Sequence, residues 1–283
     1  MQNEYILIMR CPDQPGIMAA TSQMVLAWEG DIRDAYSYGD DETGIFFLRF
    51  HLTVPDGLGR AAMEESLTLL ADKLGMGWEL HDWQRKARVL IAVSKFDHCL
   101  NDLLHRWKIG ALDVEIPAVI SNHEDVRDLV EWHGIPFHHL PVTRETREQQ
   151  EARFLELVNG LEIDLVVLAR YMQILSPQMC EALSGRCINI HHSFLPSFKG
   201  ARPYAQAYER GVKIIGATAH YVTPNLDEGP IIEQDVRRVT HATSAREMVA
   251  SGREIEASVL ARAVRWHVEH RVLINGNKTV VFA

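Results

Sequence analysis

The feature that most constrains the fold is a change of hydrophobic pattern near residue 88. From there on, short segments that are apolar at almost every position alternate with longer amphipathic ones. Strands of this kind are buried on both faces, as in a parallel sheet covered by helices. We therefore expect an α/β domain with a mostly parallel, Rossmann-like sheet. The predicted strands cover residues 88–94, 116–120, 135–141 and 164–169, and the helices between them cover about residues 97–107, 124–133 and 147–160.

The same domain is predicted to continue to the end of the chain. Further strand-like segments fall at residues 187–190, 214–223 and 230–239. A long amphipathic helix is expected from about residue 243 to residue 270. The tail, residues 271–282, has the pattern of a hairpin, because the Asn-Gly pair at its centre favours a tight turn between two strands.

The first 84 residues have a different order of elements, namely strand, helix, strand, strand, helix and a last short strand-like segment. This is the βαββαβ order of a ferredoxin-like unit. The polar stretch 84–86 is the predicted linker, so we expect domains at 1–84 and 85–283. The strands are expected at residues 5–9, 31–38, 45–54 and 78–82, and the helices at 17–28 and 59–75.

Composition excludes several classes of protein. The net charge of −9 predicts no broad basic surface for nucleic acid. No apolar run is long enough to span a membrane, and the first residues have no secretory pattern. The four cysteines form no C-x-x-C pair, which favours free thiols and no zinc site. We therefore expect a cytoplasmic protein without nucleic-acid or membrane partners.

The densest group of chemically active residues is Asn189 to Pro196, with the polar stretch Ser197–Gly200 directly after it. Side chains alternate along a strand, so Asn189 and His191 share one face. At the carboxyl end of a strand they would reach the crevice in which open α/β sheets bind ligands. Two converging donors could stabilise negative charge on a carbonyl oxygen. The same residues could also simply terminate a strand with satisfied hydrogen bonds.

A second candidate is Asp227, in the loop segment Leu226-Asp227-Glu228-Gly229-Pro230 between two predicted strands. A loop carboxylate beside an imidazole can raise the histidine pKa and can orient or deprotonate water. Ordinary turn chemistry also favours Asp and Gly at such positions. His220, inside the strand-like segment 214–223, is by itself more typical of a core histidine.

Together these residues resemble the folate-dependent formyltransferase family. The family signature is an Asn-x-His pair followed by Ser-x-Leu-Pro and, further along, Asp-x-Gly. This chain has these residues in the same order and at similar spacing, and residues 218–222 resemble the strand before the Asp loop. The matching positions are Asn189, His191, Ser193, Leu195, Pro196, Asp227 and Gly229.

The resemblance implies a folate site. It assigns Asn189, His191 and Asp227 as the catalytic residues that act on the formyl group of 10-formyltetrahydrofolate. Residues 170–175 would line the pterin pocket, largely through their backbone, and the loop 222–227 would line the other side. The residues expected to bind substrate are Arg170, Met172, Gln173, Ile174, Leu175, His192, Ser193, His220, Val222 and Gly229.

The N-terminal unit resembles an ACT domain, because Cys11 to Ile17 matches the Asp-x-x-Gly turn before the first helix of such domains. The resemblance implies a regulatory role, with Asp13 and Gly16 near an amino-acid effector such as glycine or methionine. It also implies a homo-oligomer. A dimerisation module without a ligand is the alternative.

The formyl acceptor follows from what the chain lacks. Glycinamide ribonucleotide transformylases cradle a phosphate in a glycine-rich loop, which works because bare backbone N–H groups can approach the anion. The equivalent stretch here, residues 93–100, has no glycine and includes Phe96 and Asp97, although Lys95 could still meet an anion. Methionyl-tRNA formyltransferases carry a basic C-terminal domain for tRNA, and we expect none here because the protein is acidic. Water remains as the acceptor.

The chain therefore resembles the hydrolases of the family, which join an ACT domain to the catalytic domain. This implies release of formate and tetrahydrofolate, which supplies formate for purine synthesis and balances the folate pools, with no metal or prosthetic group. Formyl transfer to an amine, or a non-catalytic folate or amino-acid sensor, are the alternatives. The sequence leaves open whether Asp227 or His191 is the general base, and whether His192 holds water. His138 and His139 are weaker site candidates.

Overall fold

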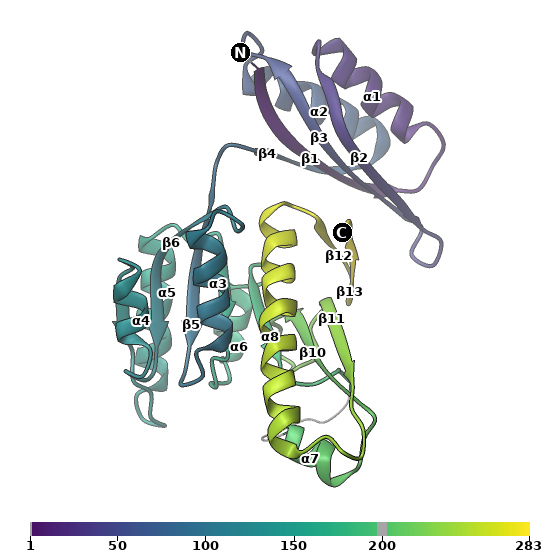
Figure 1. Ribbon diagram of the computed structural model, residues 1–283. Helices are drawn as coiled ribbons and strands as arrows, with labels where there is room; N and C mark the ends of the chain where they lie inside the picture. The colour runs from purple at the N-terminus through teal and green to yellow at the C-terminus, as the bar shows by residue number, and fades with distance from the viewer. Residues whose placement is uncertain (1, 197–202) are drawn as a thin grey trace. The chain divides into compact units, whose positions relative to one another are not determined.

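The N-terminal strands pair into an antiparallel sheet in the order β2-β3-β1-β4. β1 lies between β3 and β4 and is longer than predicted, because its pairing with β3 extends the strand from polar Gln2 to Pro12. α1 and α2 cover one face, as Figure 1 shows, and their apolar side chains form one core with the sheet. The elements are β1 (Gln2–Pro12), α1 (Ile17–Ala27), β2 (Asp31–Asp40), β3 (Ile45–Pro55), α2 (Arg60–Leu74) and β4 (Gly77–Asp82).

This computed structural model describes residues 2–196 and 203–283. Residues Ser197–Gly200, included in the predicted polar segment, lie outside the described residues. The chain divides into two compact units, one up to Lys86 together with Phe282 and Ala283, and one from Ala87 to Val281. The ferredoxin-like order of the first unit and the α/β order of the second confirm the predicted fold class. No helix in the described residues is long and apolar enough to cross a membrane.

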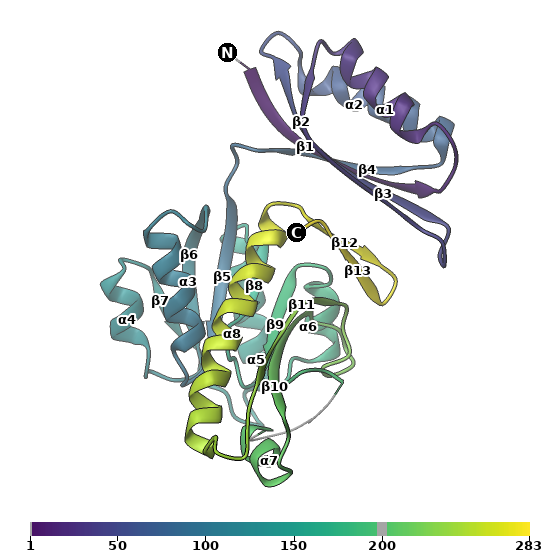
Figure 2. The same ribbon diagram turned by 45° about the vertical axis from the view of Figure 1, so that its right-hand side comes forward.

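The second unit is built on a mostly parallel sheet in the order β11-β10-β9-β8-β5-β6-β7 (Figure 2). Strands β7, β6, β5, β8 and β9 run parallel to their neighbours, whereas β10 and β11 are antiparallel. The strands are β5 (Ala87–Val93), β6 (Val114–Ser121), β7 (Phe137–His139), β8 (Leu165–Leu168), β9 (Cys187–His191), β10 (Ile214–Tyr221), β11 (Ile231–Arg238), β12 (Val272–Asn275) and β13 (Lys278–Val281).

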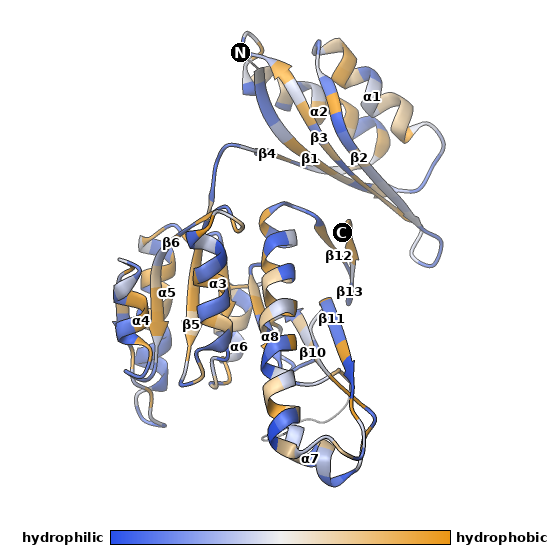
Figure 3. Cartoon of the chain, viewed as in Figure 1, coloured by the Kyte–Doolittle hydropathy of each residue, from blue (hydrophilic) through white to orange (hydrophobic). Residues whose placement is uncertain are grey.

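Helices cover both faces of this sheet. α3 and α8 pack on one face and α5 and α6 on the other, each over its own apolar core. Figure 3 shows the consequence for hydropathy, since the inner strand β5 is largely apolar and the edge strand β11 is largely polar. The helices are α3 (His98–Lys108), α4 (Arg127–Trp132), α5 (Arg147–Gly160), α6 (Pro177–Ala182), α7 (Pro203–Glu209) and α8 (Ala245–Val268).

The prediction missed α6 and α7. α6 carries a usable signal, because Ser176 accepts a hydrogen bond from the Met179 N–H as the N-cap and Pro177 occupies the first helical position. Both helices are under three turns long, too short for hydrophobic periodicity to show. β12 and β13 form the predicted C-terminal hairpin.

Candidate active site

A cavity of about 320 Å³ lies at the carboxyl ends of β8 and β9. Three stretches that are far apart in the chain form its walls, namely residues 170–175 after β8, 189–192 at the end of β9, and 222–227 after β10. In open α/β sheets the loops after parallel strands diverge at this edge and leave room for a ligand. The cavity has the size expected for a small-molecule site.

Asn189 faces this cavity and pairs across the sheet with His220. The two residues are opposite each other in the β9–β10 ladder, and Asn189 Nδ2 lies 3.2 Å from His220 Nε2. His220 Nδ1 lies 2.9 Å from the Tyr221 carbonyl oxygen, so Nδ1 carries the proton and Nε2 accepts from the Asn189 amide. An amide has two N–H hydrogens, so Asn189 keeps one to donate to a ligand.

His191 and Asp227 form the second pair in the cavity. His191 Nδ1 lies 3.2 Å from Asp227 Oδ1, and His220 Nε2 lies 3.8 Å from the same oxygen. The backbone of Asp227 has a positive φ of 59°, which turns its carboxylate back toward β9. His191 Nε2 is buried, and within the described part of the chain it has no hydrogen-bond partner. The geometry leaves this atom for a ligand in the cavity.

Electrostatics set the charge on these groups. Burial raises the pKa of Asp227, but the hydrogen bond from His191 and the nearby histidines outweigh it, so the pKa falls below the ordinary aspartate value. Burial lowers the pKa of His220, against the opposing effects of the Tyr221 carbonyl and Asp227. At neutral pH the site therefore holds an ionised Asp227 beside a neutral His220.

Sequence reasoning missed the residues that fix the end of β9. Thr218 lies opposite His191 in the β9–β10 ladder. Its hydroxyl donates to the Ser193 carbonyl at 2.9 Å and accepts from the Leu195 N–H at 3.0 Å. Gln234 on β11 donates to the same hydroxyl at 2.9 Å. The segment after His191 is thereby tied to two strands, and Thr218 belongs to the 218–222 stretch that already resembled the family.

Hydrogen bonds from the end of β5 and from α5 hold the loop 170–176 in place. The Ser94 hydroxyl, at the end of β5, accepts from the Met172 N–H at 2.9 Å. From α5, Gln150 donates to the Tyr171 hydroxyl at 2.8 Å, and Glu151 accepts from the Ser176 N–H at 2.8 Å. No local pattern in the sequence marks these partners, because each contact joins distant elements.

Most residues predicted to bind substrate lie around the cavity. Ser193 and Gly229 do not line it, as far as the described residues go. A Cβ atom on Gly229 would lie 1.8 Å from the Tyr221 carbonyl oxygen, so this glycine allows the Asp227 loop to approach β10 closely. The predicted residues that line the cavity are Arg170, Met172, Gln173, Ile174, Leu175, His192, His220 and Val222, together with Asn189, His191 and Asp227.

The weaker histidine candidates lie elsewhere. β7 contains His138 and His139 and is the outermost parallel strand, separated from β8 by β5 and β6. His139 Nδ1 lies 2.8 Å from a Glu124 carboxylate oxygen, and burial lowers the pKa of His138. The contacts of both histidines are those of structural residues, and neither histidine lines the cavity in the described structure.

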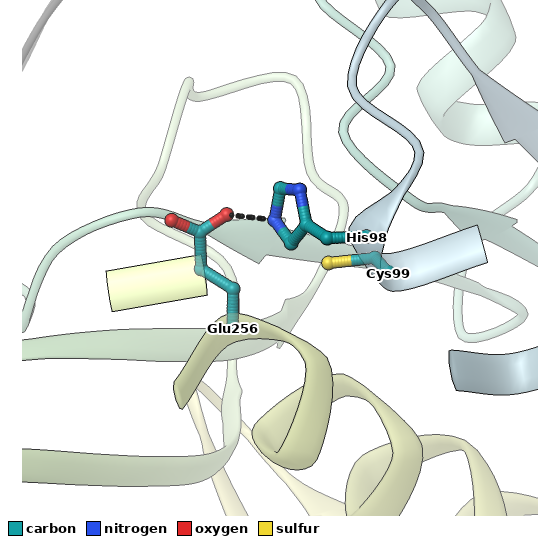
Figure 4. A group of neighbouring side chains, drawn as sticks. All are labelled: His98, Cys99 and Glu256. Carbon is teal, nitrogen blue, oxygen red and sulfur yellow. Dashed lines mark hydrogen bonds and ion pairs between the residues drawn. The ribbon is translucent and has the colours of Figure 1, made fainter. Parts of the chain in front are cut away.

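A group that could be mistaken for a metal centre lies between α3 and α8. Among the described residues, His98, Cys99 and Glu256 place candidate ligand atoms within 4.8 Å of one another (Figure 4). The Glu256 carboxylate already accepts from the Tyr204 hydroxyl at 2.7 Å and contacts His98 Nε2 at 2.8 Å. Burial raises the pKa of the Cys99 thiol, which disfavours the thiolate that a metal needs. The donor set fits internal pairing better than a metal.

Comparison with known proteins identifies the family of this chain. Residues 87–264 match the model of the formyl transferase family. The chain is 49% identical to formyltetrahydrofolate deformylase of Bacillus subtilis, over 98% of this chain and 93% of the relative. It belongs to the formyltetrahydrofolate deformylase family. The Escherichia coli K12 deformylase is 45% identical over 96% of this chain and 95% of the relative.

Solved structures extend the comparison to both units. The deformylase structure from Pseudomonas syringae has a TM-score of 0.96 and 49% identity, and the match covers 100% of this chain and 95% of that one. A glycinamide ribonucleotide transformylase from Symbiobacterium toebii has a TM-score of 0.66 and 27% identity, over 72% of this chain and 98% of that one. The deformylase family therefore shares the fold of its catalytic unit with transferases.

Proposed function

We propose that this chain hydrolyses 10-formyltetrahydrofolate to formate and tetrahydrofolate. Its place in the deformylase family supports the reaction. The observation that carries the mechanism is the meeting of Asn189 and His191, both at the end of β9, with Asp227 from a loop at one cavity. In this proposal the folate is the substrate, and protein side chains supply the chemistry.

The proposed steps start with the formyl oxygen. The remaining N–H of Asn189 and an N–H at His191 Nε2 donate to this oxygen, and water attacks the formyl carbon. The negative charge that develops on the oxygen is stabilised by donors that are already in place. The carbon–N10 bond then breaks, its electron pair goes to N10, and a proton reaches that nitrogen.

Asp227 has two roles in this scheme, since it orients His191 and accepts a proton from water. Its ionised carboxylate, 3.2 Å from His191 Nδ1, fixes the orientation of the imidazole and leaves Nε2 for the ligand. The same carboxylate is also the nearest anion in the cavity that could take the proton of the attacking water. We therefore propose Asp227 as the general base and His191 as the electrophilic donor.

The surrounding loops would bind the pterin. Backbone groups of residues 170–175 are held in place by Ser94 and α5, and exposed Met172, Ile174 and Leu226 offer apolar contacts at the cavity. A flat ring with polar edges suits such a slot. The loop 222–227 would cover the other side of the ring.

The decisive experiment omits any acceptor other than water. The protein is incubated with 10-formyltetrahydrofolate alone, and formate and tetrahydrofolate are both followed. Equal amounts of the two products are expected. The Asp227→Ala variant, prepared in the same way, controls for contaminating hydrolase activity. Dependence of turnover on an added amine would refute hydrolysis, and folate binding without turnover would indicate a sensor.

The proposal extends to regulation by the N-terminal unit and to a homo-oligomer in the cytoplasm. Gly16 starts α1 with a φ of 94°, and a Cβ on Gly39 would lie 2.8 Å from the Asp13 carboxylate, so the turn and strand β2 approach closely there. All four cysteines are buried and unbonded, which suits a reducing compartment. Calorimetry and rate measurements with glycine and methionine test the effector, and light scattering tests the assembly. No heat and no change in rate would reject the effector.

A further inference from the structure

The topological switch point of the catalytic sheet lies between β5 and β8. The chain moves outward from β5 through β6 and β7, then returns to place β8 on the other side of β5. In open α/β sheets, the crevice at the carboxyl ends of such a strand pair is the usual place for a ligand. The cavity described above lies to one side of this point, along β8 and β9.

The chain itself fills the switch point on the α3–α8 face. Four residues from four elements meet there, and we refer to them as the ion cluster: His98 at the start of α3, Arg170 after β8, Tyr204 on α7 and Glu256 on α8. Glu256 is central. Its carboxylate lies 2.8 Å from His98 Nε2, 3.3 Å from Arg170 Nε and 2.7 Å from the Tyr204 hydroxyl.

The centre of the ion cluster is buried, whereas His98 at its edge is partly exposed. Glu256 is 1% exposed and Arg170 is 9% exposed. Nitrogens Nε and Nη1 of Arg170 are covered although, among the described residues, neither has a hydrogen-bond partner. Burial raises the pKa of Glu256, but His98, Arg170 and Tyr204 together bring it below the ordinary glutamate value. The acid is therefore ionised and balanced by the guanidinium, as a buried charge must be.

Neighbouring residues pack closely against the ion cluster. The Tyr204 ring lies so close to Gly252 that a Cβ there would be 2.1 Å from Tyr204 Cζ. The Arg170 guanidinium lies over the Phe96 ring, 5.6 Å from its centre. Arg170 also lines the substrate cavity, so the ion cluster forms a boundary of that cavity.

We propose that the ion cluster is an internal plug that occupies the space of a second substrate, so that water is the nucleophile left to attack the formyl carbon. The inference rests on the proposed function. The transformylases that share this fold are named for transfer to glycinamide ribonucleotide, a second substrate that must lie beside the formyl donor. The switch point is the part of the crevice next to the cavity, and here it is filled by protein.

Removing the plug should admit an amine. The amine nitrogen would attack the formyl carbon, the carbon–N10 bond would break with its electron pair going to N10, and the amine proton would pass to N10. The products would be an N-formyl amine and tetrahydrofolate, with no change in oxidation state. Hydrolysis and transfer would then compete in the same active site, and the product ratio measures access to it.

The test compares wild type with the Arg170→Gly/Glu256→Ala double variant, given 10-formyltetrahydrofolate and glycinamide. Removing both charges avoids a buried unpaired ion, and glycine suits the positive φ of 63° at residue 170. The ratio of N-formylglycinamide to formate, corrected for the uncatalysed reaction, should rise at least about tenfold, which corresponds to about 1.4 kcal/mol between the two barriers.

Two further variants distinguish the effect of filled volume on the product ratio from the effect of charge. Glu256→Gln keeps the volume of the plug and should retain the wild-type product ratio. Arg237→Ala/Glu254→Ala removes an exposed ion pair on β11 and α8, with Nη1 and Oε2 2.6 Å apart, and should also leave the ratio unchanged. If the Arg170→Gly/Glu256→Ala protein does not fold by circular dichroism, Arg170→Gly/Glu256→Gln, which also leaves no buried unpaired charge, is tested in its place.

If the Arg170→Gly/Glu256→Ala protein folds and hydrolyses the substrate but keeps the wild-type product ratio, the proposal that the ion cluster is a plug is refuted. A rise in the ratio for Glu256→Gln equal to that of the double variant would overturn the steric argument. Absence of formate production by the wild type would refute the proposed function instead, so the two failures are distinguishable.

Discussion

At the residue scale, Asn189 and His191 are each oriented by a different partner. Asn189 is held by His220 on the neighbouring strand, and His191 by Asp227 on a loop. Alternation along β9 predicted that the two side chains share a face. It could not predict His220 as the partner of Asn189, because that contact depends on the register between β9 and β10.

Replacing either donor tests the oxyanion role. Asn189→Ala or His191→Ala should lower kcat by about 10²–10³-fold, the usual effect of losing one preorganised donor, with a much smaller change in KM. Steady-state kinetics measure both constants. Asn101→Ala, at an exposed position on α3, is the control. A change in KM alone would assign the residue to substrate binding.

The lowered pKa of His220 predicts a pH dependence of stability. The unfolded chain protonates this histidine near its ordinary value of 6.5, whereas the folded protein resists protonation until lower pH. The unfolded state therefore binds more protons, and stability falls as pH drops below about 6.5. Urea unfolding at several pH values should show a smaller loss in His220→Gln than in wild type. Equal losses would mean that His220 titrates normally in the folded protein.

At the element scale, the loop between β10 and β11 positions Asp227 through close backbone packing. Gly229 makes this approach possible because its Cα faces the Tyr221 carbonyl. The sequence marked the Asp-x-Gly spacing, but turn chemistry alone would explain that pattern. The contact with β10 supplies the structural reason, and the Tyr221 N–H donates to the Pro230 carbonyl oxygen at 2.9 Å directly beside it.

Gly229→Ala should therefore damage both stability and activity. The added Cβ would meet the Tyr221 oxygen at 1.8 Å, so the loop must shift and move Asp227 away from His191. We expect a loss of about 1–3 kcal/mol in the free energy of unfolding, typical of forced overpacking, and a lower kcat. Urea unfolding and kinetics are the measurements. Gly160→Ala, where a Cβ would meet nothing within 4 Å, is the control and should behave as wild type.

At the scale of the whole molecule, the substrate cavity belongs entirely to the unit formed by residues 87–281. A ligand that binds only the folded form of this unit stabilises it by mass action. Tetrahydrofolate should raise the melting temperature of one transition in calorimetry and leave that of the N-terminal unit unchanged. Gly229→Ala identifies the shifted transition, because it lowers that transition alone. A uniform shift of all transitions would show that the two units unfold together.

Local patterns in the sequence determined the fold class, since apolar runs require a doubly covered sheet and the βαββαβ order requires an antiparallel one. The resemblance of their order and spacing to the formyltransferase signature made Asn189, His191 and Asp227 candidates for one site. Only the tertiary structure decided what lies beside that site. His98 and Glu256 are 158 positions apart, and they meet with Arg170 because β5 and β8 are neighbours and α3, which follows β5, packs against α8. Periodicity reports which face of an element is buried, whereas strand order and helix packing decide which buried charges face one another.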